Sequence, residues 1–395
     1  MTTAPSSGHD SPPAAEPSVS QFRCQARSWL AGTDIPRLPA GYAGRPALLR
    51  RWHRTLYAAG WIGIQWPREV GGRGLSAYHQ IAFNEELARA RAPQPAGAIG
   101  LEIVGPTILK YGTPTQRARF IQPLLAGEEV WCQGFSEPGA GSDLASLRTS
   151  AIQDGADLVI TGQKIWTSWA TDADWCALLV RTDAAASRPH RGISYVLVDM
   201  HAPGVTVKPI VMLNGDAEFN ELFFDAVRVP AADVLGDLHG GWALAMDTLG
   251  WERAGYSIRR QTENEVAFEE LLDQLRAGLG GQPPQPDLAA ETGAVYARLR
   301  AFKALTRRAA QRLADGDVPS PLDSVDKLWL TQTEQAVTRL AFDLLGPART
   351  APADDEGRQR VKRYLYGRAA SVYGGSSQIQ RTIVAERLLG LPRGR

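Results

Sequence analysis

Residues 131–143 read WCQGFSEPGAGSD, and the character of the chain changes at the first of them. Pro138, Gly139 and Gly141 indicate a tight turn, which Ser142 follows directly. A loop with so little side-chain bulk can direct backbone N–H groups at an anion, with serine hydroxyls as further donors. Glycine-rich turns are common, however, and composition alone favours a plain turn between a helix and a strand.

The segments on either side of this stretch differ in their periodicity. Residues 20–130 repeat apolar side chains at helical spacing, and residues 131–235 form short runs of Val, Ile, Leu and aromatics separated by Gly, Asp and Pro. From residue 236 to 395 the helical pattern returns, whereas residues 1–19 have the composition of a disordered tail. The sequence therefore predicts an α+β fold with an N-terminal helical domain, a middle domain of antiparallel strands in a sheet or barrel, and a C-terminal helical domain.

The bulk composition excludes several classes of protein. The 395 residues are 44% hydrophobic and 22% charged, with a formal net charge of +1, which gives no reason to expect nucleic acid or an anionic membrane as the main partner. Cys24, Cys132 and Cys176 share no CxxC spacing, so we expect neither a disulfide framework nor a structural zinc site. The sequence contains no long apolar run and no signal peptide, so we expect a cytoplasmic protein.

A second segment with possible chemistry is GQKIWTSWA, residues 162–170. Trp166, Thr167 and Ser168 stand where a strand should end. A tryptophan beside hydroxyl groups suits a flat, conjugated ligand with polar edges. A core tryptophan at the end of a strand explains the same pattern equally well.

A third segment, TLGWERAGY at residues 248–256, carries Glu252 within an apolar helix. A carboxylate in such surroundings can have a raised pKa and act as a base. Trp251 and Tyr256 flank it within the apolar pattern. The alternative for Glu252 is an ordinary ion pair on a helix face, with Arg253 or Arg259.

Near the C-terminus, Gly374, Gly375, Ser376 and Ser377 separate two helical stretches in RAASVYGGSSQIQRTIVAERLLG. Each glycine costs a helix about 1 kcal/mol relative to alanine. Bare backbone at this point allows a ligand to approach closely.

Together, FSEPGAGSD, GQKIWTS and YGGSSQIQR, in this order and at these separations, resemble the acyl-CoA dehydrogenase family over residues 20–395. The resemblance implies an N-terminal helical domain, a middle β domain and a C-terminal four-helix bundle, with FAD bound across a subunit interface of an oligomer. It also implies an acyl thioester substrate, carried by CoA or by an acyl carrier protein, and an electron-transfer flavoprotein as acceptor.

The resemblance assigns residues to the cofactor by position. Gln133, Phe135 and Ser136 should line the isoalloxazine ring, Trp166 should pack on it, and Ser168 should contact it near N5. Gly141 and Ser142 should approach the pyrophosphate, and Ser376 and Gln378 should meet the adenosine diphosphate portion of the cofactor. Gly375, with Gly374, should let the backbone approach the flavin and the thioester closely. No metal is implied.

The resemblance also suggests where the catalytic base lies. Many members place a glutamate directly after the tyrosine of YGGSS, but this chain has Gly374 there, which cannot titrate. A second group, which includes isovaleryl-CoA dehydrogenases, supplies the base from the helix after the β domain, where Glu252 falls. Glu252 would then remove the α-proton while the backbone N–H of Gly374 and a flavin ribityl hydroxyl hold the thioester carbonyl oxygen. The β-hydrogen would leave as hydride to flavin N5, giving the trans-2-enoyl thioester.

Two departures bear on assembly. The stretch VAFEELLDQLRAGLG lacks the Arg-x-x-Phe-Gly motif with which many homotetrameric members grip FAD pyrophosphate, and Asp343 replaces a glutamine found in many members. Either another subunit type supplies the missing grip, or Arg276 and its neighbours replace it. The chain is most similar to an actinobacterial branch in which some members oxidise steroid side-chain CoA thioesters and several work as heteromers. A flavin monooxygenase of the same fold and a non-catalytic subunit of a heteromeric dehydrogenase are the alternative functions.

Overall fold

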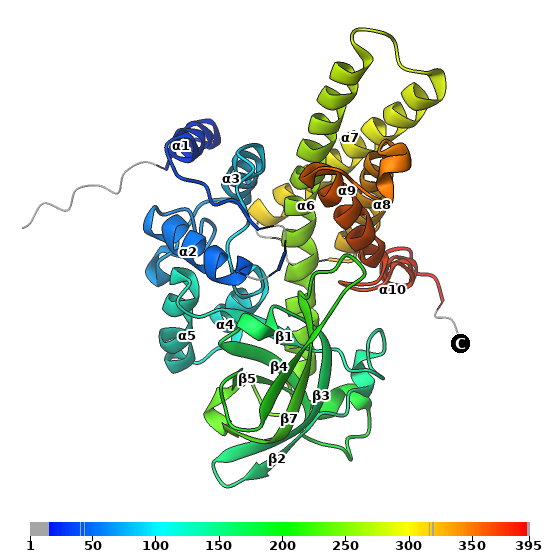
Figure 1. Ribbon diagram of the computed structural model, residues 1–395. Helices are drawn as coiled ribbons and strands as arrows, with labels where there is room; N and C mark the ends of the chain where they lie inside the picture. The colour runs from blue at the N-terminus through cyan, green and yellow to red at the C-terminus, as the bar shows by residue number, and fades with distance from the viewer. Residues whose placement is uncertain (1–15, 40, 43, 316, 318–319, 393–395) are drawn as a thin grey trace, which may run out of the picture.

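The structure is a computed structural model that describes residues 16–39, 41–42, 44–315, 317 and 320–392; the side chains of residues 251–256, 258, 347 and 349 are outside this description. Helices occupy the first part of the chain, as the periodicity predicts (Figure 1). They are α1 (Val19–Ala31), α2 (Arg45–Ala58), α3 (Ala77–Arg89), the π-helical turn η2 (Gly100–Val104), α4 (Gly105–Tyr111) and α5 (Pro114–Ala126).

The start of α5 shows how local sequence fixes a helix and also joins two parts of the fold. Thr113 accepts a hydrogen bond from the Gln116 backbone N–H, and the Gln116 side chain accepts one from the Thr113 N–H. This reciprocal capping satisfies two donors that the helix leaves unpaired. The Gln116 amide then donates to the carbonyl oxygens of Ala232 and Val234, at the far end of the β domain.

The middle part of the chain forms one sheet. Its strands are β1 (Trp131–Gly134), β2 (Ser150–Asp154), β3 (Asp157–Ser168), β4 (Trp175–Arg181), β5 (Ile193–Asp199), β6 (Val205–Ile210), β7 (Phe219–Pro230) and β8 (Val234–Leu235). Among the described residues they pair in the order β6-β7-β3-β2-β4-β5-β8, and β1 pairs with β4. The ends of β3 and β7, which belong to the candidate site, are therefore neighbours in the sheet.

The sheet differs from the purely antiparallel one that the sequence predicts, because β2 pairs in parallel with β4 at Ser150 and Arg181, and β1 also runs parallel to β4. Gly134 makes this close pairing possible: a Cβ there would lie 2.7 Å from Leu178 Cδ1 and 2.9 Å from Cys176 Sγ. Cys132 and Cys176 face each other in this ladder as buried, free thiols. The sheet is therefore mixed.

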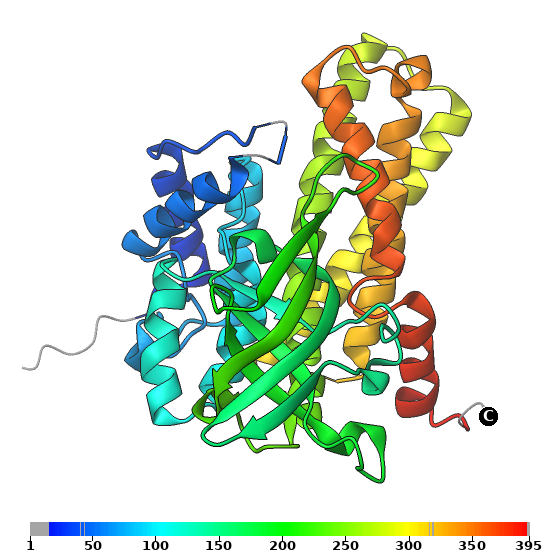
Figure 2. The ribbon, with the colours of Figure 1, turned by 60° about the horizontal axis from the view of Figure 1, so that its bottom comes forward.

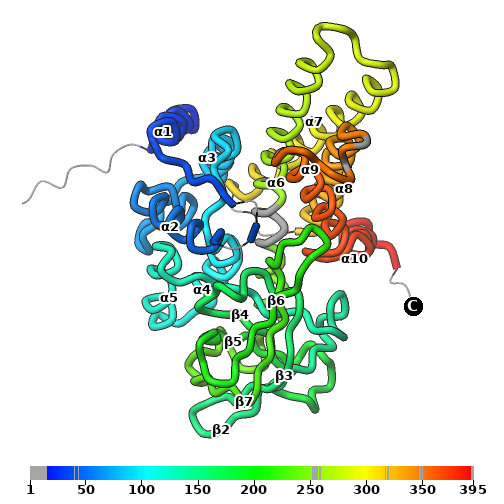
Figure 3. The backbone as a smooth tube through the Cα atoms, in the orientation of Figure 1, coloured from blue at the N-terminus to red at the C-terminus, as the bar shows by residue number. Residues whose placement is uncertain are grey.

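The C-terminal part is a helical bundle built of α6 (Gly241–Leu279), α7 (Pro286–Ala314), α8 (Leu322–Asp343) and α9 (Asp355–Gly367), with α10 (Ser377–Ile383) and the π-helical turn η9 (Val384–Leu388) after it. The backbone trace shows α6 running between the N-terminal helices and α7–α9 (Figure 3). Its neighbours include α3 and η2 on one side and α8 on the other. The predicted α+β arrangement of helices, sheet and bundle is confirmed.

One loop connects all three parts. Residues 211–218, between β6 and β7, extend from the sheet toward the C-terminal helices (Figure 2). In this loop the Asp216 carboxylate binds Lys362 of α9 at 2.8 Å and Arg45 of α2 at 3.4 Å. These ion pairs are partly buried and link the loop to both helical parts.

Candidate active site

The turn after β1 leaves its backbone open to a ligand. Reciprocal backbone hydrogen bonds of 3.0 Å between Glu137 and Ala140 close the turn. Cβ atoms added at Gly139 and Gly141 would meet no described atom within 4 Å, and neither glycine has a positive φ. The chain itself therefore does not require glycine here. The exposed, bare backbone beside Ser142 suits the approach of an anionic group such as a diphosphate.

The end of β3 presents an aromatic ring outward. Trp166 has a left-handed φ of 62°, and the β3–β7 register shifts between Lys164 and Thr167, which marks a bulge. Bulges redirect side chains next to functional sites. Trp166 is 57% exposed, and its indole meets Phe219 edge-on, with 6.3 Å between ring centroids. A large ring held on the surface by strained backbone fits the packing surface that a flat ligand needs.

The structure brings these two segments together. The Ile165 N–H donates to the Ser136 carbonyl oxygen at 2.9 Å, so the half-buried Ser136 and the Trp166 ring belong to one edge of the β domain. Phe135 is buried below this edge and packs edge-on against Tyr195, with ring centroids 5.7 Å apart. Gln133, in β1, is half-buried, as is Ser168, the last residue of β3.

In the C-terminal segment, the fold of the chain itself requires glycine. Gly374 and Gly375 have φ values of 61° and 84°, which residues other than glycine seldom adopt. A Cβ on Gly375 would also lie 2.4 Å from Nε2 of Gln380. That buried amide donates to the carbonyl oxygens of Gly374, at 3.0 Å, and Gly375, at 3.3 Å. Ser376 accepts from the Ile379 N–H and caps α10, while Gln378 is exposed on the same helix.

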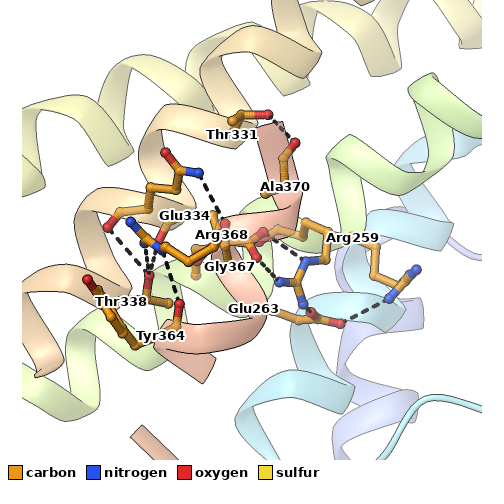
Figure 4. A network of polar contacts seen from close by, with 12 residues as sticks. Arg259, Glu263, Thr331, Glu334, Thr338, Tyr364, Gly367, Arg368 and Ala370 are labelled. Atoms are coloured by element: carbon orange, nitrogen blue, oxygen red, sulfur yellow. Dashed lines mark hydrogen bonds and ion pairs between the residues drawn. The ribbon is translucent and has the colours of Figure 1, made fainter. Parts of the chain in front are cut away.

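Helix α8 supports the other end of this loop. Lys327 and Thr331 both donate to the Ala370 carbonyl oxygen at 3.0 Å, and the Lys327 ammonium lies 4.3 Å from the ring centroid of Tyr373. Figure 4 shows the Thr331 contact at one end of the network between α6, α8 and α9. Buried polar side chains on α8 therefore fix the approach to Gly374, and sequence reasoning missed them.

Glu252, the expected base, stands in α6, and its side chain lies outside the described residues, as do those of Trp251 and Tyr256. The following turns of α6 carry a network of charges that is partly drawn in Figure 4. Arg259 pairs with Glu102 of η2 at 3.0 Å and with Glu263 at 3.3 Å. Arg260 pairs with Glu263 at 2.6 Å and with the buried Glu334 of α8 at 2.7 Å.

One carboxyl beside this network has an unusual pKa. Burial raises the pKa of Glu218 to about 6, although the charge of Arg260 acts in the opposite direction. The nearby Asp216 carboxylate raises it further, while Tyr366 and Arg259 lower it. Glu218 precedes β7, so this titratable group lies where the sheet, α6 and α9 meet. In the sequence, Glu218 is only a lone acidic residue before a strand, which does not indicate this role.

Arg276, which could replace the arginine of the absent Arg-x-x-Phe-Gly motif, lies on the surface. Arg276 is 72% exposed and pairs with Asp273 one turn earlier in α6, at 3.0 Å. Asp343, at the end of α8, pairs with Arg339 at 2.5 Å. Within the described part of the chain, no cluster of three side chains could hold a metal ion, and no helix has the length and apolarity needed to span a bilayer.

Three segments of the chain match the family models of known protein domains. Residues 17–128 match the N-terminal domain, residues 132–227 the middle domain and residues 239–389 the C-terminal domain of acyl-CoA dehydrogenases. The matches follow the order of helices, sheet and bundle.

Individual relatives agree with these matches. The acyl-CoA dehydrogenase IpdE1 of Mycobacterium tuberculosis is 42% identical, over 95% of this chain and 98% of its own length. Two solved structures are each 31% identical: the Tcur3481-Tcur3483 steroid ACAD, with a TM-score of 0.83 over 96% of this chain and 99% of that one, and the ChsE4-ChsE5 complex from Mycobacterium tuberculosis, with a TM-score of 0.82 over 98% and 100%.

Proposed function

This chain belongs to the acyl-CoA dehydrogenase family, a family of flavin-dependent oxidoreductases, and we propose that it binds FAD and desaturates an acyl thioester between its α and β carbons. The product is the trans-2-enoyl thioester. Glu252 of α6 is the base that removes the α-proton.

The observation that carries the proposal is the joined edge of the β domain. There the exposed Trp166 ring and Ser136 are fixed by the Ile165–Ser136 hydrogen bond, beside a turn whose glycines face open space. An aromatic surface next to bare backbone N–H groups matches a ligand with a flat ring at one end and a diphosphate further along. FAD has this composition, so the residues present fit the cofactor.

In the proposed site, Trp166, Ser136 and Ser168 hold the flavin ring, with Gln133 and Phe135 lining it, and Gly141 and Ser142 bind the diphosphate. Gly375, Ser376 and Gln378 contact the remainder of the cofactor. FAD, when bound, supplies the hydride acceptor for the β-hydrogen.

The chain's own residues carry the proton chemistry. An α-proton of a thioester is weakly acidic, so its removal by Glu252 needs donors at the carbonyl oxygen that strengthen as negative charge develops there. We assign one such donor to the backbone N–H of Gly374. The contacts of Gln380 with the Gly374 carbonyl and of Lys327 with the Tyr373 ring restrain the chain on either side of that N–H and limit the reorganisation that the reaction requires.

The test is an anaerobic titration of the purified protein with a panel of acyl-CoA thioesters that differ in length and branching. Bleaching of the flavin absorbance with formation of the enoyl product supports the proposal and identifies the preferred acyl group. The contrary result is a flavin band that no thioester bleaches. If an added reductant then bleaches it and oxygen is incorporated into a product, the protein is a monooxygenase instead.

We further propose that the chain works with a related subunit and passes its electrons to an electron-transfer flavoprotein. The ChsE4-ChsE5 complex, as its name states, joins two chains. In this chain Arg276, the candidate to replace the arginine of the absent Arg-x-x-Phe-Gly motif, is already paired with Asp273 on an exposed turn of α6. The test compares the FAD content and mass of the protein purified alone and after co-expression with a second acyl-CoA dehydrogenase chain from the same genome. One FAD per chain in a homomer would contradict the heteromer.

A further inference from the structure

The middle domain buries a complete lysine side chain. Lys164 of β3 is 0% exposed, and its ammonium lies 2.8 Å from Oε1 of Glu137. The same ammonium donates to the carbonyl oxygen of Phe135 at 3.1 Å. Lysine is almost never fully buried unless it is paired, because an unpaired charge in the interior loses its hydration without compensation.

Glu137 uses its remaining acceptors on the backbone of another segment. Oε2 accepts from the Arg148 N–H at 2.7 Å, and Oε1 also accepts from the Thr149 N–H at 2.9 Å. One carboxylate therefore joins the turn after β1, the chain entering β2 and, through Lys164, the end of β3. The Glu137 backbone itself closes the glycine turn through its hydrogen bonds with Ala140.

The residues held by this pair are immediate neighbours of those at the proposed cofactor edge. Ser136 stands between Phe135 and Glu137, and Trp166 follows Lys164 by two residues. Alternate residues of a regular strand share a face, so Trp166 would point inward like Lys164. The bulge and the left-handed φ of Trp166 turn its ring outward instead. Lys164 is the interior anchor directly before that bulge.

Burial and pairing act in opposite directions on the two groups. Burial lowers the pKa of Lys164 to about 8 against the opposing effect of Glu137. Burial acts to raise the pKa of Glu137, but the charge of Lys164 and the hydrogen bonds from Lys164 and Thr149 outweigh it and lower that pKa. A buried ion pair generally contributes little more stability than an apolar pair of equal volume. Its specific effect here is geometric, because directed bonds fix three segments relative to one another.

We infer that Glu137 and Lys164 are the positioning residues of the cofactor edge, which set Ser136 and the Trp166 ring at the separation that the flavin requires. The inference rests on the proposed binding of FAD. It concerns residues that touch the proposed ligand only through their neighbours.

The experiment compares wild-type protein with Lys164→Met, Glu137→Gln and the double variant. Arg228→Met is the control, because Arg228 forms exposed ion pairs with Asp154 and Asp157 in the same domain. For each protein, the unfolding midpoint of the apoprotein is measured first. The Kd for FAD, the visible spectrum and the midpoint potential of the bound flavin are then measured well below the unfolding temperature.

We expect each single variant to weaken FAD binding about 10- to 100-fold, the scale of a lost hydrogen bond to a charged group, and to shift the flavin potential and spectrum. The double variant, which buries no unpaired charge, should regain apoprotein stability but not FAD affinity or potential. Arg228→Met should change none of these quantities.

Loss of apoprotein stability with an unchanged Kd, spectrum and potential would overturn the positioning role and leave a purely structural pair. A folded wild-type protein that binds no FAD would overturn the proposed function as well, and is recognised before any variant is compared.

Discussion

Gln380 donates its side-chain amide to the carbonyl oxygen of Gly374 at 3.0 Å, and so closes the loop that precedes α10 from the inside. The amide is buried and leaves no room for a side chain on Gly375. This relationship gives the glycine pair a role in the folded chain that is independent of any ligand.

Gly375→Ala should lower the free energy of unfolding by about 1–3 kcal/mol, because the residue has a φ of 84° and its new Cβ would displace the Gln380 amide. Urea unfolding of the apoprotein measures the change. Gly139→Ala is the matched control, since it has an ordinary φ and its Cβ meets no described atom. Equal stabilities of the two variants would show that the Gln380 amide moves aside without lowering the free energy of unfolding.

Ser142→Ala should weaken FAD binding by about 1–3 kcal/mol, the usual contribution of a hydrogen bond to a charged group. The hydroxyl stands on the exposed side of the turn, so the fold should remain as stable as before. Equilibrium titration of apoprotein with FAD measures the affinity. Ser150→Ala serves as the control, because that hydroxyl donates within the sheet to Thr161. If both variants bind FAD like wild type, the turn does not hold the diphosphate.

Glu218→Gln should change how stability depends on pH. Burial raises the pKa of Glu218 in the folded protein to about 6, above its ordinary value of 4.5. Between these values the folded state binds more protons than the unfolded state. The contribution of Glu218 to stability is therefore complete below pH 4.5 and is lost as the pH rises through 6.

The Glu218→Gln variant should lack this fall in stability and exceed wild type above pH 6. Unfolding midpoints at half-unit steps from pH 4 to 8 provide the measurement. Glu356→Gln, at an exposed position on α9, is the control. An unchanged slope between pH 4.5 and 6 would mean that Glu218 does not titrate there.

The order of the elements could be predicted from the sequence because hydrophobic period and turn residues are local signals. The end of β3 at Ser168 follows from the same pattern. The parallel pairing of β1 with β4 could not be predicted, since it depends on the close approach that Gly134 allows to residues far along the chain.

The polar residues that hold the site could not be predicted from the sequence either. Glu137 and Lys164 stand 27 residues apart, and a lysine within an apolar strand pattern is ordinarily taken as exposed. Only its position in a strand with few other charges could have indicated burial. Lys327 and Gln380 gave no local signal, because their contacts with Ala370 and Gly374 arise from packing of helices against a loop.

Glu252→Gln should abolish most of the desaturation while retaining FAD, since an amide cannot accept the α-proton. We expect the rate of flavin bleaching by the preferred acyl-CoA to fall about 100- to 10,000-fold, the range of general-base contributions. Anaerobic stopped-flow absorbance measures that rate, and the FAD content of the same sample shows that the site is intact.

Glu270→Gln is the matched control for this last change, because Glu270 belongs to the same helix and pairs on the surface with Arg91 at 2.7 Å. It should bleach at the wild-type rate. Comparable rates in the Glu252 and Glu270 variants would move the base to another residue. Loss of FAD from the Glu252 variant alone would assign that carboxylate to cofactor binding, because removal of a proton acceptor does not by itself change the affinity for the flavin.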